Sequence, residues 1–175
     1  MFNLFKKSKK QNISTETMSI DEYVAAIKPK VAEALADPYI LERLDGKHIL
    51  DEKAKFKKGL SFDELRECSN RLSRILTICG KFREHFEIGL DALDKRTMSA
   101  EEETKFLTAT NIVEIIEKAN SETPMKYDEN DTRDAETMAK GNDIMLGAVQ
   151  KMFNVALEAE VLFIKMRKKH MQGFV

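Results

Sequence analysis

The feature that most constrains the fold is a stripe of apolar and small residues between positions 65 and 93. Its members alternate at spacings of three and four residues through four heptads, a period that an α-helix produces and a strand does not. The stripe consists of Leu65, Cys68, Leu72, Ile75, Cys79, Phe82, Phe86, Gly89 and Leu93. The opposite face, marked by Asn70, Thr77, Glu84 and Asp91, is polar. One long amphipathic helix is therefore predicted, with an apolar face that the rest of the chain must cover.

Three serine–glutamate pairs predict where helices begin. In each pair the serine stands three residues before the glutamate, the capping-box pattern in which each side chain binds the other residue's backbone amide. The pairs are Ser19 with Glu22, Ser61 with Glu64, and Ser99 with Glu102. Few residues interrupt helices, because the chain has only three prolines and seven glycines. One of these prolines, Pro29, predicts either a kink or a restart in the first helix.

The predicted fold is all-α: an antiparallel bundle of three long helices with shorter N-terminal helices packed on it. The long helices are expected over residues 61–95, 99–120 and 132–170, and the short ones over 19–36, 37–46 and 49–58. The last long helix carries a second alternating stripe, made of Met138, Asn142, Met145, Val149, Met152, Ala156, Ala159, Phe163 and Met166. No sheet is expected.

Length and charge set the domain organisation and exclude one class of partner. Residues 1–18 are expected to form a flexible tail, and residues 19–175 a single helical-bundle domain. The whole chain carries a net charge of −1 and its first ten residues carry +4, so the remaining residues carry −5. A nucleic-acid-binding face needs the opposite sign, because binding displaces counterions from phosphates. No nucleic-acid partner is therefore expected.

The first ten residues combine an apolar tip with a cluster of lysines. Such a segment can bind an anionic bilayer weakly, because apolar side chains enter the interface and each lysine near the surface contributes on the order of 1 kcal/mol. The candidate membrane-surface residues are Phe2, Leu4, Phe5, Lys6, Lys7, Lys9 and Lys10. The alternative is a disordered tail that only keeps the chain soluble.

Two cysteines, Cys68 and Cys79, share the core stripe eleven residues apart. At about 1.5 Å per residue they lie about 16 Å apart, too far to form a disulfide. Both are expected to be small buried hydrophobic residues. Unpaired thiols and the lack of a secretory signal pattern favour a cytoplasmic location, and the tail would place the protein at the inner face of a membrane.

We expect no catalytic, cofactor-binding or metal-binding residues, and hence no enzyme. No histidine stands three residues after a glutamate, as a carboxylate-bridged metal site in a bundle requires. Residues 121–131 are acidic but lack the central glycine and the ligand spacing of a calcium loop. His85 lies beside the core stripe, where it is either a boundary residue or a phosphotransfer histidine on a bundle surface.

The predicted function is that of a non-enzymatic interaction protein, an adaptor or assembly factor. The alternative is a small-molecule sensor with a pocket between the central and last helices, lined by methionine and phenylalanine. The nine methionines would suit an adaptable pocket, although methionine also fills irregular cores. Gly89 leaves a similar choice open, between a close helix crossing and a ligand.

A second apolar stripe on the last helix gives the most specific prediction of a partner. Phe153, Leu157, Val161 and Ile164 follow one another at spacings of four, four and three residues. Val161 lies about 160° around the axis from Phe163, so this part of the helix is apolar on two opposed faces. Either the short N-terminal helices cover the second face, or that face binds a protein partner or a second copy of the chain.

Overall fold

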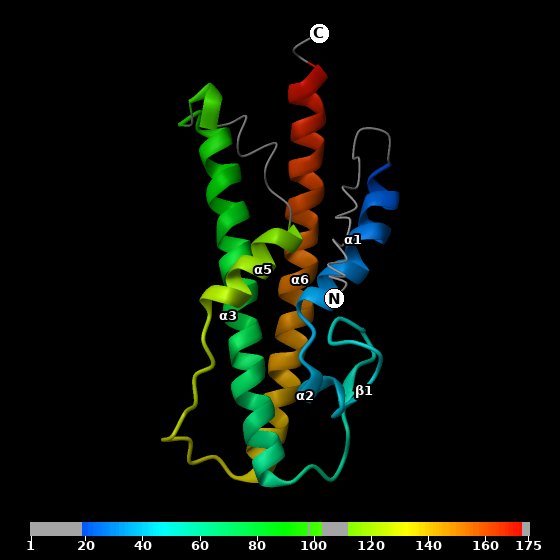
Figure 1. Ribbon diagram of the computed structural model, residues 1–175, viewed down its shortest axis with the longest axis vertical. Coiled ribbons are helices and arrows are strands. Elements are labelled where there is room, and N and C mark those ends of the chain that lie inside the picture. The colour runs from blue at the N-terminus through cyan, green and yellow to red at the C-terminus, as the bar shows by residue number, and fades with distance from the viewer. Residues whose placement is uncertain (1–18, 98, 103–111, 173–175) are drawn as a thin grey trace, which may run out of the picture.

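The computed structural model describes residues 19–97, 99–102 and 112–172 (Figure 1). The protein is 69% helical and 3% strand, which confirms the predicted all-α class. Its elements in chain order are α1 (Ile20–Ala34), α2 (Pro38–Leu41), β1 (Leu44–Asp45), β2 (Lys55–Phe56), α3 (Phe62–Asp94), α5 (Ile112–Glu122) and α6 (Ala135–Gln172).

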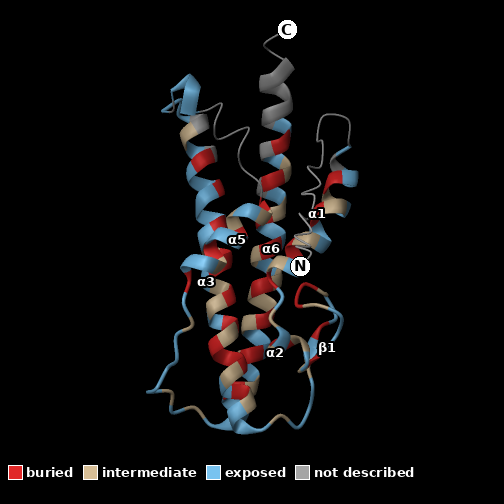
Figure 2. Ribbon diagram, viewed as in Figure 1, coloured by how far each residue is buried: buried red, intermediate tan, exposed pale blue. Residues whose placement is uncertain are grey.

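Two long helices, α3 and α6, pack side by side and run in the same direction (Figure 1). Along α3 every stripe residue from Leu65 to Gly89 is buried, as the sequence predicts. Phe82 and Phe86 are completely buried, and Phe153 of α6 is 1% exposed. Figure 2 shows many of the buried residues gathered where the long helices meet. Burying one such side chain stabilises the fold by roughly 1.5–3 kcal/mol.

Polar contacts at the N-terminal ends of α3 and α6 hold the two helices together. Asn142 is completely buried, and its Nδ2 donates a hydrogen bond of 2.8 Å to the carbonyl oxygen of Leu65. Arg133, just before α6, donates a hydrogen bond of 3.0 Å to the hydroxyl of Ser69. A shift of one helix along the other would leave the buried Asn142 amide without this partner, so the contact favours one register.

The first helix begins as the sequence predicts. The Ser19 hydroxyl accepts a hydrogen bond of 3.2 Å from the amide of Glu22, and the Glu22 carboxylate accepts one of 2.7 Å from the amide of Ser19. The helix runs from Ile20 to Ala34 and continues through Pro29, so it does not restart there. Tyr23, Ile27 and Val31 lie on its buried face, Ala32 is buried as well, and so is Leu35, which caps its C-terminal end.

The segment after α2 corrects three predictions. The helix expected over residues 49–58 is wrong, because Leu44–Asp45 and Lys55–Phe56 instead pair as an antiparallel two-stranded sheet. The expectation of no sheet is wrong for the same reason. The second helix, which the sequence predicts to extend to residue 46, ends at Leu41.

Tertiary contacts shape this segment, which has no helical period of its own. Ile49 is buried, and Gln150 of α6 donates hydrogen bonds to the carbonyl oxygens of Ile49 (3.3 Å) and Asp51 (2.9 Å). Gly46 has a φ of +154°, and a Cβ at this position would lie 3.2 Å from the Cβ of Ala54. These long-range contacts outweigh the helical preference of the lysine-rich sequence.

The helix expected over residues 99–120 is described at its two ends. Its capping box is present, with hydrogen bonds of 2.9 Å from the Ser99 amide to Glu102 and 3.3 Å from the Glu102 amide to Ser99. The later part, α5 (Ile112–Glu122), runs obliquely across α3 and α6 (Figure 1). Residues 103–111 lie outside the described chain.

The packing of α3 in the core predicts that substituting alanine for two different phenylalanines of this helix changes the free energy of unfolding by very different amounts. Phe82→Ala should lower the free energy of unfolding by about 3–5 kcal/mol, because it leaves a cavity at a completely buried position. Phe62→Ala, at a position that is 42% exposed, should change it by less than about 1 kcal/mol. Urea unfolding followed by circular dichroism measures both, and equal losses would contradict the packing described.

Candidate functional site

The second apolar stripe of α6 lies on the side of the helix that contacts α1. Phe153 and Ile164 are 1% and 6% exposed, so they belong to the core of the chain. Leu157 and Val161 are half-buried, and Leu157 packs against that core. The hydrogen bond between Tyr23 and Glu160 places α1 against part of this side of α6. A partner that contacts the exposed parts of Leu157 and Val161 stays a prediction.

A buried acid lies within this contact. Glu160 is 1% exposed, and the hydroxyl of Tyr23 in α1 donates a hydrogen bond to its Oε1. The backbone amide of Ile112 in α5 also lies near the carboxyl group, whose Oε2 has no hydrogen-bond partner among the described residues. Burial raises the pKa of Glu160 to about 7, although Tyr23 and the Ile112 amide both act to lower it. Glu160 therefore joins α1, α5 and α6.

One cavity formed by the described residues is a groove beside α1, of about 430 Å³, open to solvent and mostly apolar. This α1 groove is lined by Val24, Ala25, Lys28, Pro29, Ala32, Glu33, Ala36, Leu41, Lys47 and His48. Four of its residues, Ala25, Pro29, Ala32 and Ala36, are small and let another chain approach the backbone of α1 closely. Pro29 has no amide hydrogen, so the carbonyl oxygen of Ala25 cannot receive the hydrogen bond usual at that position.

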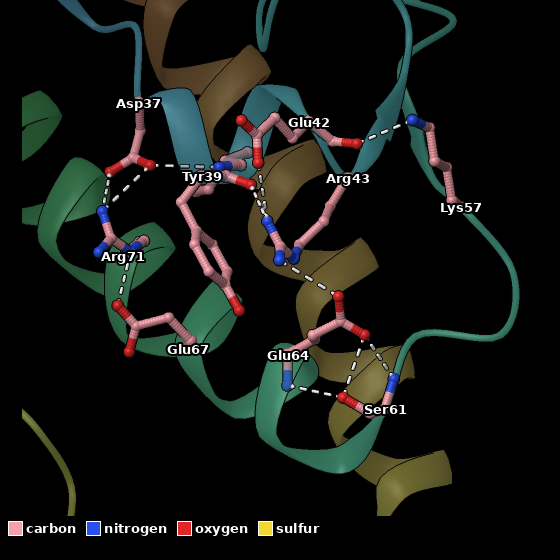
Figure 3. A network of polar contacts seen from close by, with 10 residues as sticks. Asp37, Tyr39, Glu42, Arg43, Lys57, Ser61, Glu64, Glu67 and Arg71 are labelled. Atoms are coloured by element: carbon pink, nitrogen blue, oxygen red, sulfur yellow. Dashed lines mark hydrogen bonds and ion pairs between the residues drawn. The ribbon is translucent and has the colours of Figure 1, made fainter.

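The wall of the α1 groove opposite α1 is formed by Leu41, the last residue of α2, and by Lys47 and His48 after it. Polar contacts around Tyr39 hold α2 in place (Figure 3). The Arg43 guanidinium lies 3.5 Å from the centre of the Tyr39 ring, and the Arg71 guanidinium lies 4.8 Å from it. Such cation–π contacts each contribute about 0.5–2 kcal/mol, depending on how far solvent is excluded. Arg71 belongs to α3, so Tyr39 connects α2 to the long helix.

Carboxylates complete this connection (Figure 3). Asp37 accepts a hydrogen bond of 3.1 Å from the amide of Ile40 and pairs with Arg71 at 3.0 Å, so it caps α2 and binds α3 at once. Arg43 pairs at 3.2 Å with Glu64, which belongs to the capping box of α3. The wall of the groove is thus fixed to α3 before any partner binds.

The second cavity is a polar pocket of about 200 Å³ between α3 and the chain that follows α5. This Arg74 pocket is lined by Asn70, Ser73, Arg74, Thr77, Lys81, Glu122, Thr123, Pro124 and Lys126. Three of these residues are cationic and one is acidic. The pocket is therefore positively charged in a chain whose net charge is −1.

Three other sequence predictions concern the cysteines, His85 and the tail. Cys68 and Cys79 are both completely buried, as expected, and burial raises their pKa values to about 11 and about 12.

His85 is exposed, and partial desolvation together with Lys118 lowers its pKa, which favours a neutral imidazole. The candidate membrane-surface positions between residues 2 and 10 lie outside the described residues.

Across the described parts of the chain, no three His, Cys, Asp or Glu side chains are grouped so as to hold a metal ion. None of the described helices combines the length and apolar character needed to cross a bilayer. The two cavities lie away from the contact between α3 and α6, where Phe82, Phe86 and Met138 are completely buried. The chain matches no family model, and no curated protein or solved structure gives a significant match.

Neither cavity is among the sequence predictions, although the sequence carries a signal for each. The small residues of the α1 groove recur along α1 at spacings of four, three and four. Arg74 and Lys81 share the polar face of α3 on which Asn70 and Thr77 stand. The contribution of Thr123 had no such signal, because it stands 49 residues beyond Arg74 and meets it only in the folded chain.

The buried acid predicts an unusual dependence of stability on pH. Glu160 has a pKa near 4.5 when unfolded and about 7 when folded, so the folded state keeps its proton between these values. Stability should therefore fall as pH rises from about 4.5 to 7, by about 3 kcal/mol in total. Glu160→Gln should remove this loss and should be the more stable protein at pH 8.

Urea unfolding at pH 5 and at pH 8 measures the effect. The control is Glu158→Gln, which removes an exposed carboxylate from the same helix and should leave the pH dependence unchanged. A Glu160→Gln variant with the pH dependence of the unmodified protein would contradict the assignment.

Proposed function

We propose that this protein is a non-enzymatic helical interaction protein, an adaptor or assembly factor, that binds a partner protein in the α1 groove. The observation that carries the proposal is an open apolar surface on a helix whose opposite face is buried in the core. Grooves of this kind accept the apolar face of an amphipathic helix or an extended segment. The small residues along α1 allow such a segment to lie close to the helix axis.

The rim of the α1 groove favours a particular chemistry in the partner. Lys28, Lys47 and His48 line the groove together with one acid, Glu33. Complementary charge would steer and orient a segment that carries aspartate or glutamate beside its apolar residues. The partner is thus an acidic, amphipathic segment of another protein. The lysine-rich tail of the chain itself has the wrong charge for this groove.

The contacts around Tyr39 support this function by keeping the groove in shape. A wall that is already held by Arg43 and Arg71 loses little conformational freedom when a partner binds. The α1 side is equally fixed, because Ile27 and Val31 are buried on its inner face. The groove therefore has a preorganised shape rather than one that must form on binding.

The proposal extends to the architecture and to the tail. An antiparallel bundle of three long helices with the short helices packed on it stays a proposal: α3 and α6 run parallel, as its first and third helices must, whereas α5 crosses them obliquely (Figure 1). The tail joins the chain directly before α1, so a tail held weakly on an anionic cytoplasmic membrane face would place the α1 groove near that surface.

A second copy of the chain is the competing partner, and one observation favours it. Ile144, Val155 and Leu162 of α6 are 73%, 47% and 51% exposed. Their spacings of eleven and seven residues place them within about 20° of one line along the helix. This exposed line differs from the stripe that the sequence singled out. The sensor alternative, with a pocket lined by methionine and phenylalanine, has no comparable support.

The charge at the rim gives the test of the α1 groove. Proximity labelling in cells that make the chain identifies the partner, and calorimetry with the purified partner measures its affinity. Lys28→Glu with Lys47→Glu should weaken binding by about tenfold or more, because it reverses the charge that faces an acidic segment. The matched control, Lys81→Glu with Lys126→Glu, makes the same change in charge at the Arg74 pocket and should have less than about a twofold effect.

A partner that binds the groove variant and the unmodified protein equally well would overturn the proposal. A dimer in light scattering, abolished by Ile144→Glu with Leu162→Glu while no partner is labelled, would overturn it in favour of self-association.

The tail predicts a separable membrane contact. Deleting residues 1–10 should leave the melting temperature unchanged, because these residues have too few apolar side chains to offset the entropy of ordering them. The deletion should abolish co-sedimentation with vesicles of anionic lipid at low salt. Replacing the four lysines by glutamine in the full-length chain should also abolish co-sedimentation, because the contact depends on their charge. Equal sedimentation of the full-length and shortened proteins would contradict the membrane contact.

A further inference from the structure

We propose that the Arg74 pocket binds the phosphate group of a small phosphorylated molecule. The pocket lies on the side of α3 where the chain leaves α5 and descends beside the long helix (Figure 1). It is separate from the α1 groove and shares no residue with it. The inference therefore stands on its own observations and does not depend on the proposed interaction with a partner protein.

Arg74 is held in the pocket by three hydrogen bonds to the end of α5 and the residues after it. Its Nε donates to the carbonyl oxygen of Thr123 at 2.8 Å, and its Nη2 donates to the carbonyl oxygen of Asn120 at 2.7 Å. Its Nη1 donates to Oδ1 of Asn120 at 3.2 Å. A guanidinium has five N–H groups, so one on each Nη atom is left for a ligand. The planar fork of a fixed arginine suits phosphate oxygens.

Thr123 supplies an observation that points to a ligand. Its side chain lines the pocket and the residue is only 7% exposed, yet its Oγ1 has no hydrogen-bond partner among the described residues. A buried hydroxyl left without a partner costs about 1–3 kcal/mol. A phosphate oxygen in the pocket would accept its hydrogen bond and remove that cost. Asn70, which is 8% exposed, contributes an amide group to the same lining.

The charge of the lining favours a dianion. Lys81 and Lys126 are exposed, and the structure assigns neither of them an ion pair with another described residue. The one acid in the lining, Glu122, lies 3.9 Å from Lys118, which offsets part of its charge. Two exposed lysines beside a fixed arginine can pair with a phosphate monoester of charge near −2.

The size and polarity of the pocket limit what binds. Its volume of about 200 Å³ has room for roughly six or seven water molecules, which is enough for a phosphate and a small polar group. The hydroxyl groups of Ser73 and Thr77 continue the polar surface along α3. An apolar ligand would leave the buried Thr123 hydroxyl without a hydrogen bond, so the ligand is a small, polar, phosphorylated molecule.

The test is a titration of the full-length, ¹⁵N-labelled protein with inorganic phosphate and with glycerol phosphate at constant ionic strength. Saturable shifts confined to the amides of the Arg74 pocket are expected. Lys81→Gln with Lys126→Gln should weaken binding by about tenfold or more, since it removes two charge-assisted contacts. Thr123→Val should weaken it less, and a spectrum with native dispersion shows that this variant is folded.

The matched control is Lys28→Gln with Lys47→Gln, which removes the same charge at the α1 groove and should leave phosphate binding unchanged. An equal loss in this control would show general electrostatic attraction and would overturn the site. The absence of saturation, or equally tight binding of acetate and citrate, would overturn the assignment to phosphate. None of these outcomes depends on whether the α1 groove binds a partner protein, so the two proposals fail separately.

Discussion

The packing of α6 is the constraint on which the rest of the structure depends. Its buried residues, from Met138 to Ile164, follow one face of the helix, and no single neighbour covers the whole of that face. α3 covers it near the N-terminal end, where Asn142 binds the carbonyl oxygen of Leu65, and α1 reaches it further along, where Tyr23 binds Glu160. The short N-terminal helix is therefore part of the core, and its outer face is left as the surface of the α1 groove.

The two candidate sites follow from this arrangement, and one side chain lies between them. Asn120, near the end of α5, donates a hydrogen bond of 2.7 Å to the carbonyl oxygen of Ala34 at the end of α1. The same residue accepts hydrogen bonds from Arg74 through its side chain and its carbonyl group. A ligand that draws on Arg74 thus acts on a residue that is bonded to the helix of the α1 groove. If the two sites are coupled, a partner in the α1 groove changes the affinity of the Arg74 pocket for phosphate by the same factor as phosphate changes the affinity of the groove for the partner.

The parts of the fold that could be predicted from the sequence are those that local pattern determines. The stripe from Leu65 to Gly89 is buried throughout, and each capping box forms the hydrogen bonds that its spacing predicts. The sheet at Leu44 and Phe56 could not be predicted, because it depends on Gln150 in a distant helix and on a close approach at Gly46.

The two candidate sites could not be predicted from the sequence for a related reason. A line of alanines with a proline has an ordinary composition for a helix, and only the position of Leu41 and His48 beside it makes a groove. The Arg74 pocket likewise needs Thr123, which the fold brings to α3 from beyond α5. Helical period predicts which face is buried, but it does not predict which exposed face is hollowed by a neighbouring element.

Glu160 restricts the register in which α1 packs on α6. Apolar contacts alone would let α1 slide or turn on α6, since aliphatic side chains accept many arrangements. An acid in the middle of that contact depends on the Tyr23 hydroxyl, which donates to its Oε1, because its Oε2 has no hydrogen-bond partner among the described residues. Any other register buries the carboxyl group without partners, at a cost of several kcal/mol. The acid thus lowers stability at neutral pH, and in return it selects the single register of α1 that forms the groove.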